Sequence, residues 1–175
     1  ADDAAAGRLA GALSRMGHLV ERLLQLSRAE AGAMGAGPCD LIRVARMVID
    51  DIGQPVMFDD GEMAQAPVAV DPDALALILR NLLRNAADHG AGDIRVVIAA
   101  GPVLTVGNTV GPGATFRHAT FDKSKTSHGA GLGLAIIARV AAAQGIAVDY
   151  AMARDRALVT LRLPPSEEGS AVEAE

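Results

Sequence analysis

Two asparagines four residues apart, Asn81 and Asn85, are the first residues in this chain whose type and spacing point to chemistry. They lie in a leucine-rich stretch, residues 75–90, whose apolar residues recur at the spacing of a helix with one buried face. Residues four apart on a helix are stacked one turn above the other. A carboxamide offers a neutral oxygen to a hard cation, and both a donor and an acceptor to a nucleotide. The alternative is that both asparagines are simply exposed polar positions.

Two glycine-rich segments follow the asparagine pair. Residues 111–113, Gly-Pro-Gly, come soon after a β-branched run and on their own are typical of a turn. Residues 129–133, Gly-Ala-Gly-Leu-Gly, directly precede an apolar helical stretch, and backbone N–H groups at a helix start bind phosphate well. No Gly-Lys-Ser/Thr follows, which excludes a Walker loop. No short strand leads tightly into this segment, which argues against a dinucleotide-binding fingerprint.

The remaining pattern predicts the elements that must position these residues. Asp40 is the expected N-cap of a helix over 41–52, and Asp71 followed by Pro72 marks the start of the central helix, which Gly90 closes. A third compact helix is expected from Gly131 or Leu132 to Gln144. Residues 109–129 carry no periodicity and are expected to form a lid. The predicted extended segments are 55–58, 67–70, 94–99, 103–106, 146–152 and 157–163.

These elements predict an α+β sandwich, in which three helices cover one face of a mixed, mainly antiparallel sheet. A long helix, residues 4–31, precedes it and shows a heptad-like apolar seam that requires a partner helix. We therefore divide the chain into a helix with its joint (1–37), a compact domain (38–164) and an acidic, flexible tail (165–175). The start has neither Met nor a signal-peptide pattern and is expected to be a cut within a longer protein.

Composition narrows the class of protein further. The chain has 175 residues, a net charge of −5 and no basic cluster, which argues against a nucleic-acid surface. Its single cysteine, Cys39, excludes a disulfide framework and a cysteine-based metal site. Half of the residues are hydrophobic but only 2% are aromatic, so the core must be aliphatic.

The order of these segments resembles the Bergerat-type nucleotide-binding fold of sensor histidine kinases, DNA gyrase, mismatch-repair ATPases and heat-shock chaperones. NLLRNAADHG (81–90) is similar to the N box of a histidine kinase, GNTVGPGA (107–114) to its first glycine box, and GAGLGLAIIARV (129–140) to its second. Phe121 and the FDKSKTS around it resemble the F-box part of the lid. The combination is far more specific than any one box and covers residue 38 to about residue 164.

The first helix separates this chain from other relatives of the fold. SRMGHLVERLLQLSRAEAG (14–32) is similar to the second helix of the dimerisation and phosphotransfer bundle of sensor histidine kinases. That similarity speaks against an anti-sigma-factor-type serine kinase. The helix carrying the phospho-accepting histidine is not expected in this chain, because His18 lacks the H-E-x-R-x-P setting and reads as a structural residue.

The resemblance implies roles for individual residues, with ATP and Mg²⁺ as ligands and Asn81 and Asn85 as the catalytic pair. Asn85 would coordinate Mg²⁺ through its side-chain oxygen, Asn81 would lie beside the phosphates, and His89 would contact phosphate or ribose. Backbone amides of the second glycine box would hold the phosphates, with lid lysines closing over them. These further binding residues are Gly129, Gly131, Leu132, Gly133, Lys123 and Lys125.

Two departures from the family pattern stand out. The first glycine box of the family normally reads D-x-G-x-G, and its Asp accepts a hydrogen bond from the adenine amine. Here the two glycines of the box are Gly111 and Gly113, and the position of the Asp is occupied by Thr109 or, if one residue is inserted, by Asn108. An Asn carbonyl can still accept from the amine. The residue before His89 is often basic in the family, whereas Asp88 is acidic and would not help to hold phosphates.

The resemblance implies an ATP-dependent protein histidine kinase that transfers the γ-phosphoryl group to a histidine outside this chain, for relay to an aspartate of a response regulator. The alternative is a degenerate module of the same fold that docks a response regulator without using ATP. The implied partners are a receiver domain, the acceptor helix of the parent protein, and a second copy joined through the N-terminal helix. The expected location is cytoplasmic, and an inner-membrane anchor of the parent protein stays open.

Overall fold

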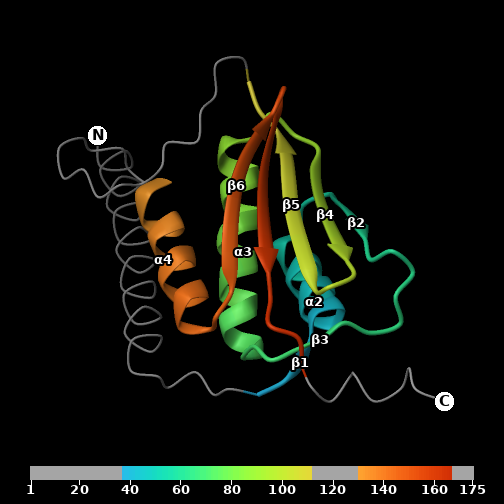
Figure 1. Cartoon of the computed structure of the whole chain (residues 1–175). Coiled ribbons are helices and arrows are strands. Elements are labelled where there is room, and N and C mark those ends of the chain that lie inside the picture. Colours follow the sequence, from blue (N-terminus) through green and yellow to red (C-terminus); the bar gives the residue numbers. More distant parts are fainter. Residues whose placement is uncertain (1–36, 112–129, 167–175) are drawn as a thin grey trace, which may run out of the picture.

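Five strands form a mixed sheet with three helices on one of its faces (Figure 1). The computed structural model describes residues 37–111 and 130–166, without the side chains of 130–132. β2 and β4 are parallel, and the other neighbouring pairs are antiparallel, which confirms the predicted sandwich. The spatial order is β2 (Val56–Asp59), β4 (Ile94–Ala99), β5 (Val103–Thr109), β7 (Arg156–Arg162) and β6 (Ala147–Ala153).

The three helices are α2 (Leu41–Ile52), α3 (Pro72–His89) and α4 (Ala130–Ala143), close to their predicted bounds. Strand residues alternate between the helix-covered face and the open face, as the burial of every second residue of β4 and β7 demonstrates. The core between the layers is aliphatic, as the composition predicts. Its largest fully buried side chains are Leu41, Val48, Val68, Leu75, Ile78, Leu79, Leu83, Ile98, Leu104, Ile136, Ile137 and Leu161.

Both predicted N-caps are confirmed. Asp40 accepts a hydrogen bond from the N–H of Ile42 at 3.0 Å, and Asp71 accepts one from Ala74 at 2.9 Å, with Pro72 at the first helical position. Gly90 ends α3 in an extended conformation, and its N–H donates to the carbonyl of Ala86 at 2.9 Å.

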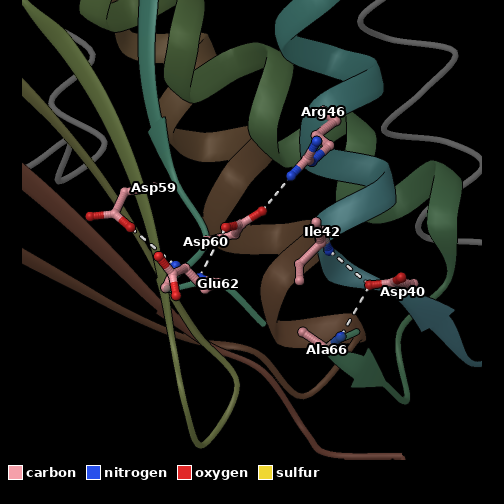
Figure 2. A network of polar contacts seen from close by, with 8 residues as sticks. Asp40, Ile42, Arg46, Asp59, Asp60, Glu62 and Ala66 are labelled. Atoms are coloured by element: carbon pink, nitrogen blue, oxygen red, sulfur yellow. Dashed lines mark hydrogen bonds and ion pairs between the residues drawn. The ribbon is translucent and has the colours of Figure 1, made fainter. Parts of the chain in front are cut away.

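A small second sheet, which the sequence did not predict, closes the end of the domain where α2 and α3 begin. β1 (Cys39–Asp40) pairs antiparallel with β3 (Pro67–Val68), so the extended segment expected over 67–70 pairs only in its first half. Asp40 also accepts from the N–H of Ala66 at 3.2 Å (Figure 2), which joins the start of α2 to this turn. On the other side of β3, Val68 forms a bridge with Pro165.

A polar network on the surface fixes the loop after β2 (Figure 2). Arg46 of α2 forms an ion pair with Asp60, and its guanidinium lies 5.4 Å from the centroid of the Phe58 ring. The hydrogen bond from Arg46 lowers the pKa of Asp60 below its usual value. Asp59 and Asp60 each accept from a backbone N–H two residues on, which stabilises the turn after β2.

α3 and α4 lie side by side and run in opposite directions. At one end, the side-chain oxygen of Gln144, just after α4, accepts a hydrogen bond from the N–H of Asp71 at 2.9 Å. The same Asp71 is buried, with 9% of its surface exposed, and caps α3. This contact therefore joins the N-cap of α3 to the residue that follows α4.

We expect Asp71→Ala to lower the free energy of unfolding by about 1–2 kcal/mol, because it removes the N-cap of α3. Denaturant unfolding followed by circular dichroism measures the change. Asp73→Ala is the matched control: Asp73 is exposed in the same first turn, and its loss should cost only a few tenths of a kcal/mol. Equal losses in the two variants would contradict the capping role.

Candidate functional site

The two asparagines of α3 project toward α4. Asn81 is buried, with 8% of its surface exposed, and its side-chain nitrogen donates to the carbonyl of Leu77 at 2.9 Å. The oxygen of this carboxamide accepts no hydrogen bond from a described residue. Asn85 is half-buried and makes no hydrogen bond within the described part of the chain. Both side chains therefore have polar atoms that no described residue binds, and neither is the exposed position that the alternative proposed.

Gly133 of α4 lies directly against this pair. A Cβ atom at Gly133 would be 3.2 Å from Oδ1 and 3.3 Å from Nδ2 of Asn85, and 3.6 Å from Oδ1 of Asn81. The missing side chain thus allows the first turn of α4 to approach both carboxamides closely. The first backbone N–H groups of a helix have no partner within it, and they favour a negative charge. The two asparagines and the start of α4 at Gly133 therefore lie next to each other.

The end of β5 borders the same region, at the C-terminal end of α3. Asn108 has 8% of its surface exposed and faces the helix-covered side of the sheet, like Leu104 and Val106 before it. A Cβ at Gly90 would lie 2.8 Å from Nδ2 of Asn108, so α3 and β5 meet through a glycine at this point too. Thr109 is opposite Arg156 in the pairing of β5 with β7, and by alternation its side chain faces the open side of the sheet.

The other residues expected at the site are described only in part. His89 is exposed in the last turn of α3, and Gly111 is exposed just after β5. Gly131 and Leu132 lie in the first turn of α4. Gly113, Lys123, Lys125 and Gly129 lie outside the described residues, as do the helix predicted over 4–31 and most of the predicted lid and tail.

The described residues contain no group of three His, Cys, Asp or Glu side chains that could hold a metal ion. An all-protein cage for a cation is therefore absent from this part of the chain. Mg²⁺ commonly keeps several waters and binds through one or two protein oxygens plus substrate phosphates. The carboxamide of Asn85 lies beside a helix start and bonds to no described residue, which fits that limited protein contribution.

Sequence reasoning missed two features of this site. Gly90 was read only as a helix end, although its close approach to Asn108 is what brings α3 against β5. The choice between Asn108 and Thr109 was left open, although the alternation of buried residues along β5 could have settled which of them faces the helices.

The fold is a two-layer sandwich in which two carboxamides lie against the start of a helix, at a glycine. This arrangement is typical of a nucleotide-binding domain. Residues 70–171 match the family described as histidine kinase-, DNA gyrase B-, and HSP90-like ATPase. The chain belongs to this family, and it is a histidine-kinase-like ATPase catalytic domain of the kind that binds ATP.

Solved structures of histidine kinases share the fold. The Acinetobacter baumannii histidine kinase AdeS is 20% identical with a TM-score of 0.69, covering 92% of this chain and 84% of that one. The histidine kinase domain of the E. coli osmosensor EnvZ is 22% identical with a TM-score of 0.57, covering 75% and 89%. The mycobacterial sensor histidine kinase MprB is 25% identical with a TM-score of 0.53, covering 75% and 100%.

A search of the curated proteins finds no match. Within the described residues, no helix has both the length and the apolar character needed to cross a membrane.

We expect Gly133→Ala to weaken ATP binding about fivefold, equivalent to ~1 kcal/mol, because the new methyl group displaces the Asn85 carboxamide. The free energy of unfolding should not fall by a comparable amount, since alanine favours a helix over glycine by up to ~1 kcal/mol. Calorimetric titration with ATP, together with denaturant unfolding, measures both quantities.

The control is the same substitution in an Asn85→Ala background. With the carboxamide already gone, Gly133→Ala should have little further effect on ATP affinity. A full fivefold loss in both backgrounds would mean that Gly133 does not act through Asn85.

Proposed function

We propose that this chain is the catalytic ATP-binding region of a bacterial sensor histidine kinase. It would transfer the γ-phosphoryl group of ATP to a histidine outside the chain, for relay to an aspartate of a response regulator. One observation carries the proposal: the carboxamides of Asn81 and Asn85 lie against Gly133, within 3.2–3.6 Å of the position of a Cβ there. Metal-binding oxygens and phosphate-binding amides would thus be available to the same triphosphate.

The proposed site holds ATP by its phosphates at the start of α4 and by its base at the end of β5. Asn85 would supply the protein oxygen for Mg²⁺, Asn81 would lie beside the phosphates, and His89 would contact phosphate or ribose. Asn108 would face the base. The further contacts assigned by the family resemblance are Gly111, Gly113, Lys123, Lys125, Gly129, Gly131, Leu132 and Gly133.

The proposed chemistry asks little of the side chains beyond position and charge. The imidazole of the acceptor histidine forms a bond to the γ-phosphorus while the bond to the β–γ bridging oxygen breaks, and ADP leaves. When bound, Mg²⁺ would neutralise charge on the β- and γ-phosphates, and the amides at the start of α4 would stabilise charge in the same way. No general base in this chain is needed, because the nucleophile is a neutral imidazole.

The partners follow from this activity. We propose that the chain acts on the acceptor helix of its parent protein, dimerises through the N-terminal helix, and serves a response-regulator receiver domain. No nucleic acid partner is expected from a chain with a net charge of −5. The proposed location is the cytoplasm, where ATP is present.

A second candidate is a domain of this fold that docks a receiver domain without using ATP. Two residues favour it: Asn108 is neutral where the family has an aspartate, and Asp88 places a negative charge beside His89. The carboxamide of Asn85, which bonds to no described residue, and its close contact with Gly133 favour the kinase, because a domain that had lost ATP would not need either.

Calorimetric titration of the 175-residue chain with ATP, with and without Mg²⁺, tests the proposal. We expect Mg²⁺-dependent binding, and Asn85→Ala should weaken it at least about tenfold because the metal loses its protein oxygen. Arg80→Ala is the control on the same helix. Arg80 is exposed and, among the described residues, pairs only with Asp51 at 2.9 Å, so its loss should leave ATP affinity unchanged.

Absence of binding by the wild-type chain would remove the kinase proposal and leave the docking module. Equal affinity of wild type and Asn85→Ala would reject the metal-binding role of Asn85.

Phosphoryl transfer needs its own measurement. With radiolabelled ATP and Mg²⁺, the chain should label a separate fragment that carries the acceptor helix of the parent protein, and label itself little. Label that accumulates on this chain alone, and is lost in His18→Ala, would show that His18 is the acceptor after all.

A further inference from the structure

Arg156, the first residue of β7, binds the residue that directly precedes β4. Its Nη1 donates to Oδ2 of Asp93 at 3.0 Å, and its Nη2 donates to the backbone carbonyl of the same residue at 3.2 Å. The two side chains are 32% and 48% exposed, and an ion pair at that exposure contributes little to stability. A planar guanidinium that binds a carboxylate and a carbonyl of one residue nevertheless constrains the backbone of that residue.

This contact spans a strand. The sheet order places β5 between β4 and β7, and Arg156 is paired with Thr109 at the end of β5. Because Ala157 is buried, alternation along β7 puts the Arg156 side chain on the open face of the sheet. Two strand spacings are about 10 Å, which an extended arginine and an aspartate cover together. The pair therefore joins the start of β7 to the start of β4 across β5.

The loop between α3 and β4, residues 90–93, leaves the regular pairing of the sheet at this point. Continuing the register of β4 and β5 would place Asp93 opposite Thr109. Thr109 instead accepts from the N–H of Ala91 at 2.7 Å and donates to the carbonyl of Gly92 at 3.2 Å. Asp93 has a φ of 57°, a left-handed conformation that is uncommon outside glycine, although aspartate tolerates it better than most residues. The arginine thus binds a residue that lies outside the ladder.

The same loop connects two parts of the candidate site. It follows His89, the last residue of α3, and Gly90 packs against Asn108 of β5, where a Cβ would lie 2.8 Å from Nδ2. Asn85 lies about one turn before His89 on the same rigid helix. Because only residues 90–93 join α3 to β4, the position at which this loop is fixed limits where the end of α3 can lie.

We infer that Asp93 and Arg156 are positioning residues for nucleotide binding. Their contact holds the loop after α3 against β5 and thereby fixes the end of α3 that carries Asn85 and His89. The inference rests on the proposed function, since it takes those two residues as ligand contacts. Neither member of the pair is placed to touch the ligand, because Arg156 lies on the open face of the sheet and the site lies on the helix-covered face.

A second pair of the same type on the same face of the sheet provides a matched control. Arg162, the last residue of β7, lies 3.3 Å from Asp149 of β6, and both side chains are more than half exposed. This pair joins two neighbouring strands at the opposite end of β7 from Arg156. If Arg156 acted only as a surface ion pair, removal of either arginine would have the same effect on ATP binding.

Titration of the whole chain with ATP and Mg²⁺ tests the inference. We expect Arg156→Met, which keeps a similar apolar stem but cannot donate, to weaken ATP binding about fivefold, because the loop loses two hydrogen bonds. Arg162→Met should leave the affinity unchanged.

Variants of Asp93 test whether the two residues act together. Asp93→Asn should stay within about twofold of the wild-type affinity, because its side-chain oxygen still accepts from the guanidinium and asparagine tolerates a left-handed backbone. Asp93→Gly also allows that backbone but removes the acceptor, and it should weaken ATP binding. In an Arg156→Met background Asp93→Gly should have little further effect.

Amide hydrogen exchange of the chain without nucleotide measures the loop directly. The N–H groups of Ala91 and Thr109 should exchange at least about tenfold faster in Arg156→Met, because they lie in the pairing that the contact supports. In Arg162→Met they should exchange at the wild-type rate. The midpoint of global unfolding should move little in either variant.

The outcomes separate this inference from the proposed function. Absence of ATP binding by the wild-type chain would overturn both. Equal ATP affinity of wild type and Arg156→Met would overturn the inference and leave the proposed function intact. Equal losses in Arg156→Met and Arg162→Met, or wild-type exchange at Ala91 and Thr109 in Arg156→Met, would also overturn it. So would a double variant of Asp93 and Arg156 that shows both single losses in full.

Discussion

The antiparallel contact between α3 and α4 is the interaction on which the site depends. It is fixed at one end by the hydrogen bond from Asp71 to Gln144 and is closest at the other, where Gly133 lies against Asn85. A side chain larger than glycine at residue 133 would separate the helices at the end where the polar groups gather. The aliphatic core beneath, with no large aromatic residue among its fully buried members, supplies the rest of this packing.

One helix, α3, joins the two parts of the site. Its middle carries the carboxamides that face α4, and its last residue is followed by Gly90, which packs against Asn108 of β5. Gly90 lies five positions after Asn85, which corresponds to about 7.5 Å along a helix axis. The spacing between the two parts of the site is therefore set by a rigid element rather than by a loop.

Local patterns in the sequence were sufficient for most of the fold. The caps at Asp40 and Asp71 depend on neighbouring residues only, and they were predicted correctly. The four strands that form the two hairpins also carry a local pattern and lie close to their predicted positions. β1 and β3 lie about 28 residues apart in the sequence. Each has only two residues, which is too few to produce a periodic pattern of apolar residues. The contact between Gly133 and the asparagines is equally non-local. Sequence order suggested that they converge, but only packing of α4 on α3 defines which glycine is in contact.

The described side chains at this site are largely neutral, which bears on how it would hold a triphosphate. Three carboxamides, Asn81, Asn85 and Asn108, line it, and among the described residues the charged neighbour Asp88 is exposed and negative. Among the described groups, attraction for phosphate would come from the start of α4, whose first amides have no partner within the helix and carry partial positive charge. Because partial charges act only over the first turn of a helix, affinity depends on how closely the ligand approaches α4. The absence of a Cβ at Gly133 lets the carboxamides of Asn81 and Asn85 lie against that first turn.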